Sequence, residues 1–477
     1  MGDFIKKAIT TLPSERQLAW QQMEFYAFIH YTVNAFTDRE WGLGDESPSV
    51  FNPTELDAGQ WVGICKSAGM KGMILTCKHH DGFCLWPSKF TEHSIKNSLW
   101  KGGQGDLVRE VSEACRKEGL KFGIYLSPWD RHEKTYGDSE RYNEYFIHQL
   151  RELLTGYGEI FCVWFDGACG EGSNGKRQIY DWDRYYRLIR NLQPSAVISV
   201  CGPDVRWCGN EAGHCRTSEW SVVPAVLLDA ERTAEKSQKE DSGEFARHIN
   251  SQEEDLGSRQ VIERADGLVW YPAEVNTSIR PGWFYHASED AQVKSTDELL
   301  SIYHASVGGN ANFLLNIPPD RRGLIHENDA ACLCKLGCML RSIYAKNLAD
   351  NASAVASECL DADHDAQKMI ETNPESYWCP REGTEKAEIE IDMKTAKTFD
   401  RIVLKEHIKA MGQRVEHFVL EIRDGDEWKE FYQGTVIGHK KICCAKKIKA
   451  RYIKLRIIQS RHCPSIESFE VNLGLDE

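Results

Sequence analysis

The stretch Trp164-Phe165-Asp166-Gly167 places a carboxylate beside an indole, directly after the apolar run Ile160-Phe161-Cys162-Val163. That run predicts a buried parallel strand, with the Asp166 carboxylate at its carboxyl end. In a β/α barrel, active sites are built at these strand ends. The indole of Trp164 offers a flat face that can pack on the apolar patch of a sugar ring. The alternative is a simple turn, because Asp-Gly is first of all a turn signal.

Other predicted strands also end in residues that can bind a substrate or transfer a proton. Any one of these residues fits a capped loop or a core position equally well. Five successive strand ends of this kind favour one shared active site. The residues are His30, Glu40 and Trp41 after the strand 25–29, His79 and His80 after 72–77, Tyr125 near the end of 121–126, Asp166 itself, and Trp207 and Glu211 after 196–200.

Two carboxylates on different strands, with imidazoles and indoles between them, suit the hydrolysis of a glycosidic bond. One carboxylate attacks or stabilises the oxocarbenium-like centre, and the other gives a proton to the leaving oxygen. A zinc site is the alternative, because His30, His79, His80 and Asp166 are residue types that bind zinc. Barrel amidohydrolases usually begin that site with His-x-His at the first strand end. This chain has a single His30 there, so we favour a site without metal.

The elements that would position these residues alternate between strand and helix up to about residue 320. Apolar residues at helical spacing predict helices at 57–68, 107–118, 140–157 and 183–192. Strand–helix units with short linkers build parallel sheets, and more than four units with continuously apolar strands favour closure. We therefore expect a TIM-like (β/α)8 barrel, the catalytic domain, over residues 1–347.

Three later stretches complete this part of the chain. Residues 229–260 are charged and poor in aliphatic residues, which predicts an exposed insertion. Strand character returns at Leu268–Tyr271. The aromatic cluster Trp283-Phe284-Tyr285-His286 marks a later strand end, where it either faces the substrate or plugs the barrel as core.

Several motifs resemble those of glycoside hydrolase family 29, the α-L-fucosidases, over residues 15–345. The family retains the anomeric configuration, so the resemblance implies that Asp166 is the nucleophile. It also implies that the fucose pocket is lined by His30, Glu40, Trp41, His79, His80, Tyr125 and Trp164, and that an aromatic residue such as Trp283 faces the fucose methyl group. The motifs are Phe28-Ile29-His30-Tyr31, Glu40-Trp41-Gly42, the runs 76–83 and 125–129, Trp164-Phe165-Asp166-Gly167, Gly308-Gly309-Asn310 and the run 314–319.

The general acid/base has two candidates. The run Arg206 to Gly213 resembles the branch of the family that cleaves α-1,3- and α-1,4-linked fucose from branched oligosaccharides. This resemblance implies that Glu211 is the acid/base, with Glu219 as the rival. An acid of this kind needs a raised pKa, which partial burial beside Trp207 would supply. We favour Glu211.

After about residue 350, alternating strands replace the helical periodicity. In the segment 451–457, Ile453, Leu455 and Ile457 would share one face while charged residues occupy the other. The segments 399–404 and 417–422 follow the same pattern. Residues 348–477 resemble a galactose-binding-like β-sandwich of the discoidin type, which is common as a carbohydrate-binding module. Such a module either binds sugar or braces the barrel, and some hold a structural calcium ion.

The composition excludes several classes of protein. The net charge is −14 with scattered basic residues, which argues against nucleic acid as a partner. No apolar run is long enough to span a membrane. The 17 cysteines form no compact framework and suit a reducing compartment, so we expect the cytoplasm. The alternative is a secreted or periplasmic protein whose signal peptide has been removed.

These observations predict a retaining exo-α-L-fucosidase that acts on α-1,3/1,4-linked fucose of Lewis-type oligosaccharides. The expected partner is the fucosylated oligosaccharide, and no cofactor is needed. Three alternatives remain, namely a non-catalytic fucose-binding protein, a broad-specificity fucosidase that acts on aryl and α-1,2 fucosides, and a metal-dependent hydrolase. The first is weakened because Asp166 and Glu211 are both present.

Overall fold

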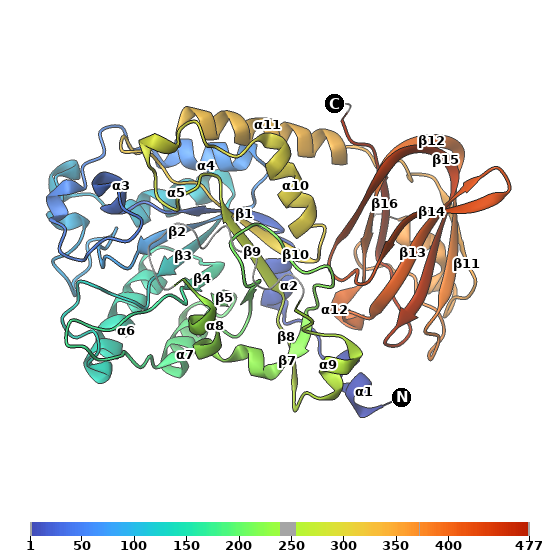
Figure 1. The fold of residues 1–477 in the computed structure, drawn as a ribbon, viewed down its shortest axis with the longest axis horizontal. Coiled ribbons are helices and arrows are strands. Elements are labelled where there is room, and N and C mark those ends of the chain that lie inside the picture. The colour runs from blue at the N-terminus through green and yellow to red at the C-terminus, as the bar shows by residue number, and fades with distance from the viewer. Residues whose placement is uncertain (1, 239–253, 372, 476–477) are drawn as a thin grey trace.

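The computed structural model contains a parallel β-barrel followed by an antiparallel β-domain (Figure 1). It describes residues 2–238, 254–371 and 373–475. Eight parallel strands form the barrel in the order β5-β4-β3-β2-β1-β10-β9-β6, and a parallel bridge from Ser199 to Val205 brings β5 to β6. This arrangement confirms the TIM-like barrel. The strands are β1 (Phe25–Ile29), β2 (Gly72–Lys78), β3 (Lys121–Leu126), β4 (Cys162–Phe165), β5 (Val197–Val200), β6 (Arg206–Trp207), β9 (Ala273–Ser278) and β10 (Ala311–Asn316).

Helices surround the barrel, and the four predicted ones are present within two residues at each end. The local sequence explains their limits, as α5 illustrates. Asp106 accepts the backbone N–H of Arg109 at 3.0 Å, and Gly119 adopts a φ of 76° at the other end. The helices of the outer layer are α4 (Ala58–Ser67), α5 (Leu107–Glu118), α6 (Ser139–Gly156), α7 (Trp182–Leu192), α10 (Thr296–Ser306) and α11 (Glu327–Tyr344).

Shorter helices lie in the loops and at the N-terminus. In the described part of the chain, every helix is too short or too polar to cross a lipid bilayer. The short helices are α1 (Asp3–Thr10), α2 (Glu15–Gln21), α3 (Asn34–Thr37), α8 (Ala230–Lys236), α9 (Arg259–Glu263) and α12 (Ile408–Met411).

The structure corrects three details of the predicted barrel. Strand β4 begins at Cys162, two residues later than expected, so Trp164 and Phe165 belong to the strand itself. Residues 201–205 contain no helix, and β6 therefore follows β5 directly. The predicted strand at 268–271 is β8 (Leu268–Trp270), which pairs antiparallel with β7 (Val222–Pro224) outside the barrel. The apolar pattern identified a strand there but carried no information on its partner.

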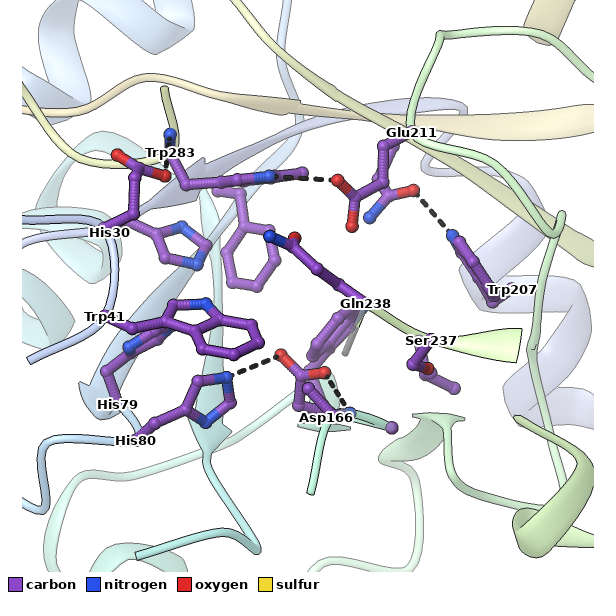
Figure 2. Close-up of a pocket in the computed structure, with 17 residues that line it drawn as sticks. His30, Trp41, His79, His80, Asp166, Trp207, Glu211, Ser237, Gln238 and Trp283 are labelled. Carbon is purple, nitrogen blue, oxygen red and sulfur yellow. Dashed lines mark hydrogen bonds and ion pairs between the residues drawn. The ribbon is translucent and has the colours of Figure 1, made fainter. Parts of the chain in front are cut away.

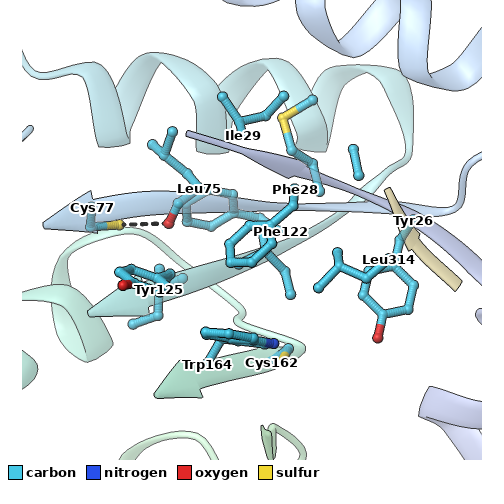
Figure 3. Close-up of a cluster of buried hydrophobic side chains, with 14 of the residues drawn as sticks. Tyr26, Phe28, Ile29, Leu75, Cys77, Phe122, Tyr125, Cys162, Trp164 and Leu314 are labelled. Carbon is cyan, nitrogen blue, oxygen red and sulfur yellow. Dashed lines mark hydrogen bonds between the residues drawn. The ribbon is translucent and has the colours of Figure 1, made fainter. Parts of the chain in front are cut away.

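Aromatic and aliphatic side chains pack together in a buried cluster around the barrel strands (Figure 3). Successive residues of a strand point to opposite faces, so Tyr26, Phe28 and His30 all point inward. Phe28 contacts Trp164 with ring centroids 5.0 Å apart, and Tyr26 contacts Phe161 at 5.7 Å. The packed aromatic layer thus lies directly beneath the residues at the strand ends.

The C-terminal domain is an antiparallel sheet with the order β11-β12-β15-β13-β14, and β16 pairs with β12. The expected alternation is present, since Ile453, Leu455 and Ile457 are buried. The pairing between β12 and β15 shifts register between Asp392 and Lys397. Such bulges bend long strands. The strands are β11 (Ser353–Ala356), β12 (Ala387–Lys405), β13 (Val415–Asp424), β14 (Glu427–Gly434), β15 (Lys441–Ser460) and β16 (Ser468–Asn472).

The two parts of the chain share a packed contact. The Ile442 N–H donates to the carbonyl of Gly308 at 3.0 Å, and the His439 N–H donates to the Asn310 side chain at 2.7 Å. Val403 and Ile442 of the β-domain belong to the same buried hydrophobic cluster as the barrel residues. The β-domain therefore contributes side chains to the core of the barrel.

Candidate active site

A pocket opens at the carboxyl ends of the barrel strands (Figure 2). It collects every predicted site residue except Tyr125 and Glu219. The charged insertion also contributes, through Ser237 and Gln238. The lining consists of Phe28, His30, Glu40, Trp41, His79, His80, Trp164, Asp166, Gly167, Ala168, Val200, Trp207, Glu211, Ser237, Gln238, Asn276 and Trp283.

Asp166 follows the last residue of β4, and two donors hold its carboxylate. The Ala168 N–H donates to Oδ1 at 2.8 Å, and the buried Tyr125 hydroxyl donates to Oδ2 at 2.9 Å. Tyr125 thus acts from behind the pocket wall. Burial raises the pKa of Asp166, while the hydrogen bonds from the backbone and from Tyr125 oppose that rise. The side chain is still 22% exposed, so the carboxylate can meet a ligand.

Glu211 lies in the loop after β6, across the pocket from Asp166. Its Oε2 accepts the indole N–H of Trp283 at 3.1 Å. Burial raises the pKa of Glu211 to about 8, and the negative charges of Asp166 and Glu40 add to the rise. At neutral pH this carboxyl group is therefore largely protonated and can donate a proton.

Glu219, the rival acid, lies outside the pocket and is 0% exposed. Its carboxylate is paired with the Arg206 guanidinium and accepts the Arg216 backbone N–H at 2.9 Å. The Arg216 guanidinium lies 3.5 Å from Glu219 Oε2, the oxygen that also accepts the Arg216 backbone N–H. A carboxylate held by two arginines inside the protein is an ion-pair partner, with no access to a substrate.

Two adjacent histidines form the wall between Trp41 and Asp166. His80 Nδ1 lies 2.7 Å from the hydroxyl of Ser127, which itself donates to the Trp129 carbonyl at 2.6 Å. Because the serine proton is already used, His80 Nδ1 is the donor and Nε2 is left as an acceptor. Nε2 lies 3.9 Å from Asp166 Oδ2. Burial lowers the pKa of His80 to about 3 and that of His79 well below its usual range, so both rings are neutral.

His30 faces the pocket in a fixed tautomer. Its Nδ1 lies 2.8 Å from Asn316 Oδ1. The Asn316 amide nitrogen donates to Ser278 Oγ and to the Trp283 carbonyl, both at 2.8 Å, which fixes the orientation of the amide. His30 Nδ1 must therefore carry the proton, and Nε2 can accept a hydrogen bond. Burial lowers the pKa of His30 to about 3.

The Glu40 carboxylate accepts hydrogen bonds from two consecutive backbone N–H groups. Its Oε2 accepts the N–H of Trp283 at 2.8 Å, and its Oε1 accepts that of Phe284 at 3.0 Å. The aromatic cluster 283–286 therefore lies beside the pocket rather than in the barrel core, and Trp283 forms part of the wall.

Glu274 is a buried residue beneath the pocket for which sequence analysis predicted no role. It accepts the indole N–H of Trp164 at 2.6 Å, the Ser199 hydroxyl at 3.3 Å and the Tyr26 hydroxyl. Burial raises its pKa to about 7. A charged residue in the otherwise uncharged strand 273–278 was the available signal. Asn276, two residues further on, accepts the Trp207 indole N–H at 2.9 Å.

The predicted exposed insertion at 229–260 is only partly exposed. Helix α8 packs on the Asp166 loop so closely that a Cβ on Gly167 would lie 2.3 Å from Ser237 Oγ. Figure 2 shows Gln238 extending into the pocket between Asp166 and Glu211. Residues 239–253 of the insertion lie outside the described part of the chain. Nothing in the charged sequence distinguished the residues that reach the pocket.

Within the described residues, no three His, Cys, Asp or Glu side chains are arranged to hold a metal ion. The candidate zinc ligands have other partners, since His30 Nδ1 and His80 Nδ1 contact Asn316 and Ser127. The arrangement instead offers two carboxyl groups in contrasting surroundings, neutral imidazole acceptors and indole faces. Such a site suits acid-assisted displacement at a sugar carbon.

Comparison with known families agrees with this geometry. Residues 9–343 match the α-L-fucosidase family, and residues 353–469 match the F5/8 type C domain. The first match covers the barrel and every pocket residue, and the second covers most of the β-domain.

Individual relatives match over nearly the whole chain. α-L-Fucosidase 1 of Arabidopsis thaliana is 42% identical over 466 residues, which cover 96% of this chain and 87% of the relative. A crystal structure of a putative α-L-fucosidase from Bacteroides ovatus has 44% identity and a TM-score of 0.86, covering 100% of this chain and 77% of the other. A Ruminococcus gnavus family 29 fucosidase in complex with fucose has 30% identity and a TM-score of 0.85, covering 98% and 95%.

Proposed function

The chain belongs to the α-L-fucosidase family, glycoside hydrolase family 29, and we propose that it hydrolyses fucosides by double displacement with retention. The observation that carries this proposal is the pair of pocket carboxyl groups, Asp166 and Glu211, in contrasting surroundings. In a retaining mechanism one of the two attacks the anomeric carbon, and the other first donates and then removes a proton.

Asp166 is the nucleophile in this proposal. Its position at a barrel strand end and the two donors to its carboxylate support the role, because they favour the charged form. The Tyr125 hydroxyl also fixes the position of Oδ2. Attack on the anomeric carbon then forms a fucosyl ester on Asp166, and the leaving oxygen departs with a proton.

Glu211 supplies that proton. The Trp283 indole N–H occupies Oε2, which leaves Oε1 to carry the proton and to face the leaving oxygen. Once the leaving group has gone, the Glu211 carboxylate takes a proton from water, and that water opens the ester. Fucose is thus released with the configuration of the substrate.

Neutral histidines orient the sugar. The free Nε2 atoms of His30 and His80 are acceptors, and fucose hydroxyls are donors. His80 Nε2 lies 3.9 Å from Asp166 Oδ2, so a fucose hydroxyl that donates to His80 would lie beside the nucleophile. Trp41 and Trp283 offer apolar faces for the ring and its methyl group.

The proposed substrates are α-1,3- and α-1,4-linked fucosides on branched, Lewis-type oligosaccharides. Support comes from the resemblance of the Glu211 loop to that branch of the family. The loop is also anchored at a distance, since Ser218 Oγ lies 2.7 Å from Thr435 Oγ1 of the β-domain. Galactose contacts to such a loop would raise kcat as well as affinity, because they hold the acid in place.

Two measurements test the proposal. Proton NMR during the first minutes of hydrolysis should show α-fucose as the first anomer, and initial β-fucose would contradict retention. Fucose release should be clear from a Lewis trisaccharide and weak from 2′-fucosyllactose and from aryl fucosides. Equal rates on all three would favour the broad-specificity alternative.

The same proposal involves no metal cofactor and a cytoplasmic location. Two carboxyl groups complete the reaction, so dialysis against a chelator should leave activity unchanged, and a loss restored by added zinc would overturn this point. All 17 cysteines are free thiols, most of them buried, which supports a reducing compartment.

A further inference from the structure

The acid/base depends on Trp283, and Trp283 depends on Glu40. The indole N–H of Trp283 donates to Glu211, and the Trp283 backbone N–H donates to Glu40 Oε2 at 2.8 Å. Any movement of Glu40 would therefore shift the indole and the hydrogen bond that orients Glu211. The contacts that hold Glu40 in place therefore also affect the orientation of Glu211.

His286 lies between Glu40 and a second carboxylate. Its Nε2 lies 2.8 Å from Glu40 Oε1, and its Nδ1 lies 2.8 Å from Asp38 Oδ1. An imidazole ring that faces a carboxylate at each nitrogen must donate from both, which requires the imidazolium form. The hydrogen bond to Glu40 is the main cause that raises the pKa of His286 to about 9, and Asp38 adds to it.

Other charged groups surround the triad of Glu40, His286 and Asp38. Glu289, in the short helix Ala287–Glu289, also favours the charged form of His286. The Arg321 guanidinium lies 3.9 Å from the same oxygen, Asp38 Oδ1. Carboxylates thus outnumber cations around the ring, so it stays charged through neutral pH.

The backbone at Gly282 leaves space for the contact between Glu40 and His286. A Cβ on Gly282 would lie 2.7 Å from Glu40 Oε1 and 3.0 Å from His286 Cδ2. Only glycine allows the carboxylate and the imidazole to lie directly over the peptide before Trp283. The Gly282 N–H donates to Glu289 at 3.1 Å, and the Gly282 carbonyl accepts the Ser278 hydroxyl at 2.7 Å. The triad and the turn therefore form one fixed unit.

We propose that His286 is a positioning residue for catalysis. As an imidazolium shared by Glu40 and Asp38, it holds Glu40 on the Trp283 backbone and so keeps the indole N–H on Glu211. The inference rests on the proposed acid/base role of Glu211. His286 itself does not line the pocket, so it acts only through Glu40 and Trp283.

The test compares His286→Gln with wild type on a series of aryl fucosides whose phenols differ in acidity. A displaced acid slows the substrates with the poorest leaving groups most, so the rate should depend more steeply on phenol acidity. We expect kcat/KM for the poorest leaving group to fall about tenfold. The basic limb of the pH profile should also move to higher pH, because losing the Trp283 hydrogen bond and a nearby positive charge raises the pKa of Glu211.

Three further variants make the outcome decisive. His326→Gln is the matched control, since His326 is also half-buried beside two carboxylates, Asp290 at 3.6 Å and Glu327 at 3.5 Å, but does not line the pocket that holds Glu211. It should leave both readouts unchanged. Asp38→Asn is a milder change at an exposed side chain and should shift both readouts in the same direction. It replaces His286→Gln as the test if that variant does not fold. Glu211→Ala is measured in parallel.

The possible results separate the two proposals. A wild-type leaving-group dependence and basic limb in His286→Gln, with a strong dependence in Glu211→Ala, would overturn the positioning role alone. No leaving-group dependence in Glu211→Ala would overturn the acid assignment and the positioning role with it. A uniform loss across all substrates, with an unmoved basic limb, would mean that His286 serves stability only.

Discussion

Asp166 and Glu211 are both carboxylic acids at strand ends, and their surroundings favour different protonation states. Burial raises both pKa values, but Asp166 receives hydrogen bonds from the Ala168 N–H and the Tyr125 hydroxyl, which stabilise its charged form. Glu211 receives one, from Trp283, and faces the negative charges of Asp166 and Glu40. Such a contrast supports the proposal that Glu211 is the acid and Asp166 the nucleophile.

Replacing the nucleophile tests the first assignment. Asp166→Gly should lower kcat on the order of a thousandfold or more, because no ester can form. Added azide should restore part of the turnover, since the space left by the side chain admits an anion to the anomeric carbon, and the product should be β-fucosyl azide. The melting temperature should remain close to wild type. Near-normal turnover without azide would sink the assignment.

The pKa of Glu211 predicts the pH dependence of the reaction. The acid must be protonated, so kcat/KM for an oligosaccharide should fall as pH rises through the Glu211 pKa of about 8. An aryl fucoside with a highly acidic phenol needs no proton and should lack this basic limb. The measurement is a pair of pH–rate profiles on the two substrates. Identical basic limbs would mean that another group controls the reaction.

The sequence could name the residues at the strand ends but could not choose between neighbouring carboxylates. Glu211 and Glu219 lie eight residues apart in the same loop, and both are followed by small or aromatic residues. Their separation comes from Arg206 and Arg216, which hold Glu219 inside the protein. Side-chain pairing of this kind depends on the path of the loop, which no local pattern records.

The element ends that carry the histidines are joined by a buried ion pair. Lys78, the last residue of β2, contacts Asp130 at 2.8 Å, and both side chains are fully buried. Lys78 also donates to Gln149 on α6 at 3.0 Å, while Asp130 accepts the N–H groups of His132 and Glu133. The loops after β2 and β3 are thereby fixed to each other beneath His79 and His80.

Removing one partner of this pair should be costly. Lys78→Met leaves the Asp130 charge buried without a counter-ion, and we expect the free energy of unfolding to fall by about 3–5 kcal/mol. The double variant Lys78→Met/Asp130→Asn removes the charge but keeps an oxygen for the two N–H groups, so it should regain part of that loss. Urea denaturation measures both. A double variant no more stable than the single one would contradict an electrostatic origin.

Sequence analysis predicted a helix or strand where the local pattern of apolar residues was clear. Strands β1 to β5 were visible because each is an apolar run between helices of clear periodicity. Strand β6 has only two residues and exists through its parallel pairing with β9, a contact between distant segments. The contribution of the segment around α8 was not predicted, because a charged segment normally faces solvent. Ser237 and Gln238, directly after α8, nevertheless reach the pocket.

At the scale of the whole molecule, the β-domain forms part of the barrel's core. Val403 and Ile442 are buried in the same cluster as the barrel residues, and Gly308 packs so closely that an added Cβ would lie 2.7 Å from Ile442 Cβ. The β-domain also holds the loop that carries Glu211, through Thr435 and Ser218. Two domains that share a core should unfold together, so calorimetry of the wild type should show one transition.

Ile442→Asp tests this coupling. The substitution places a charge in a site that is 5% exposed. Burying this charge should destabilise the contact between the domains by on the order of 3 kcal/mol or more. We expect the single transition to split in two, because the interface opens before either core melts. Val355→Asp, at a position of the same domain that is 71% exposed, should leave one transition at nearly the wild-type temperature. Two transitions already present in the wild type would refute the coupling, since the shared cluster would then not link the stabilities of the barrel and the β-domain.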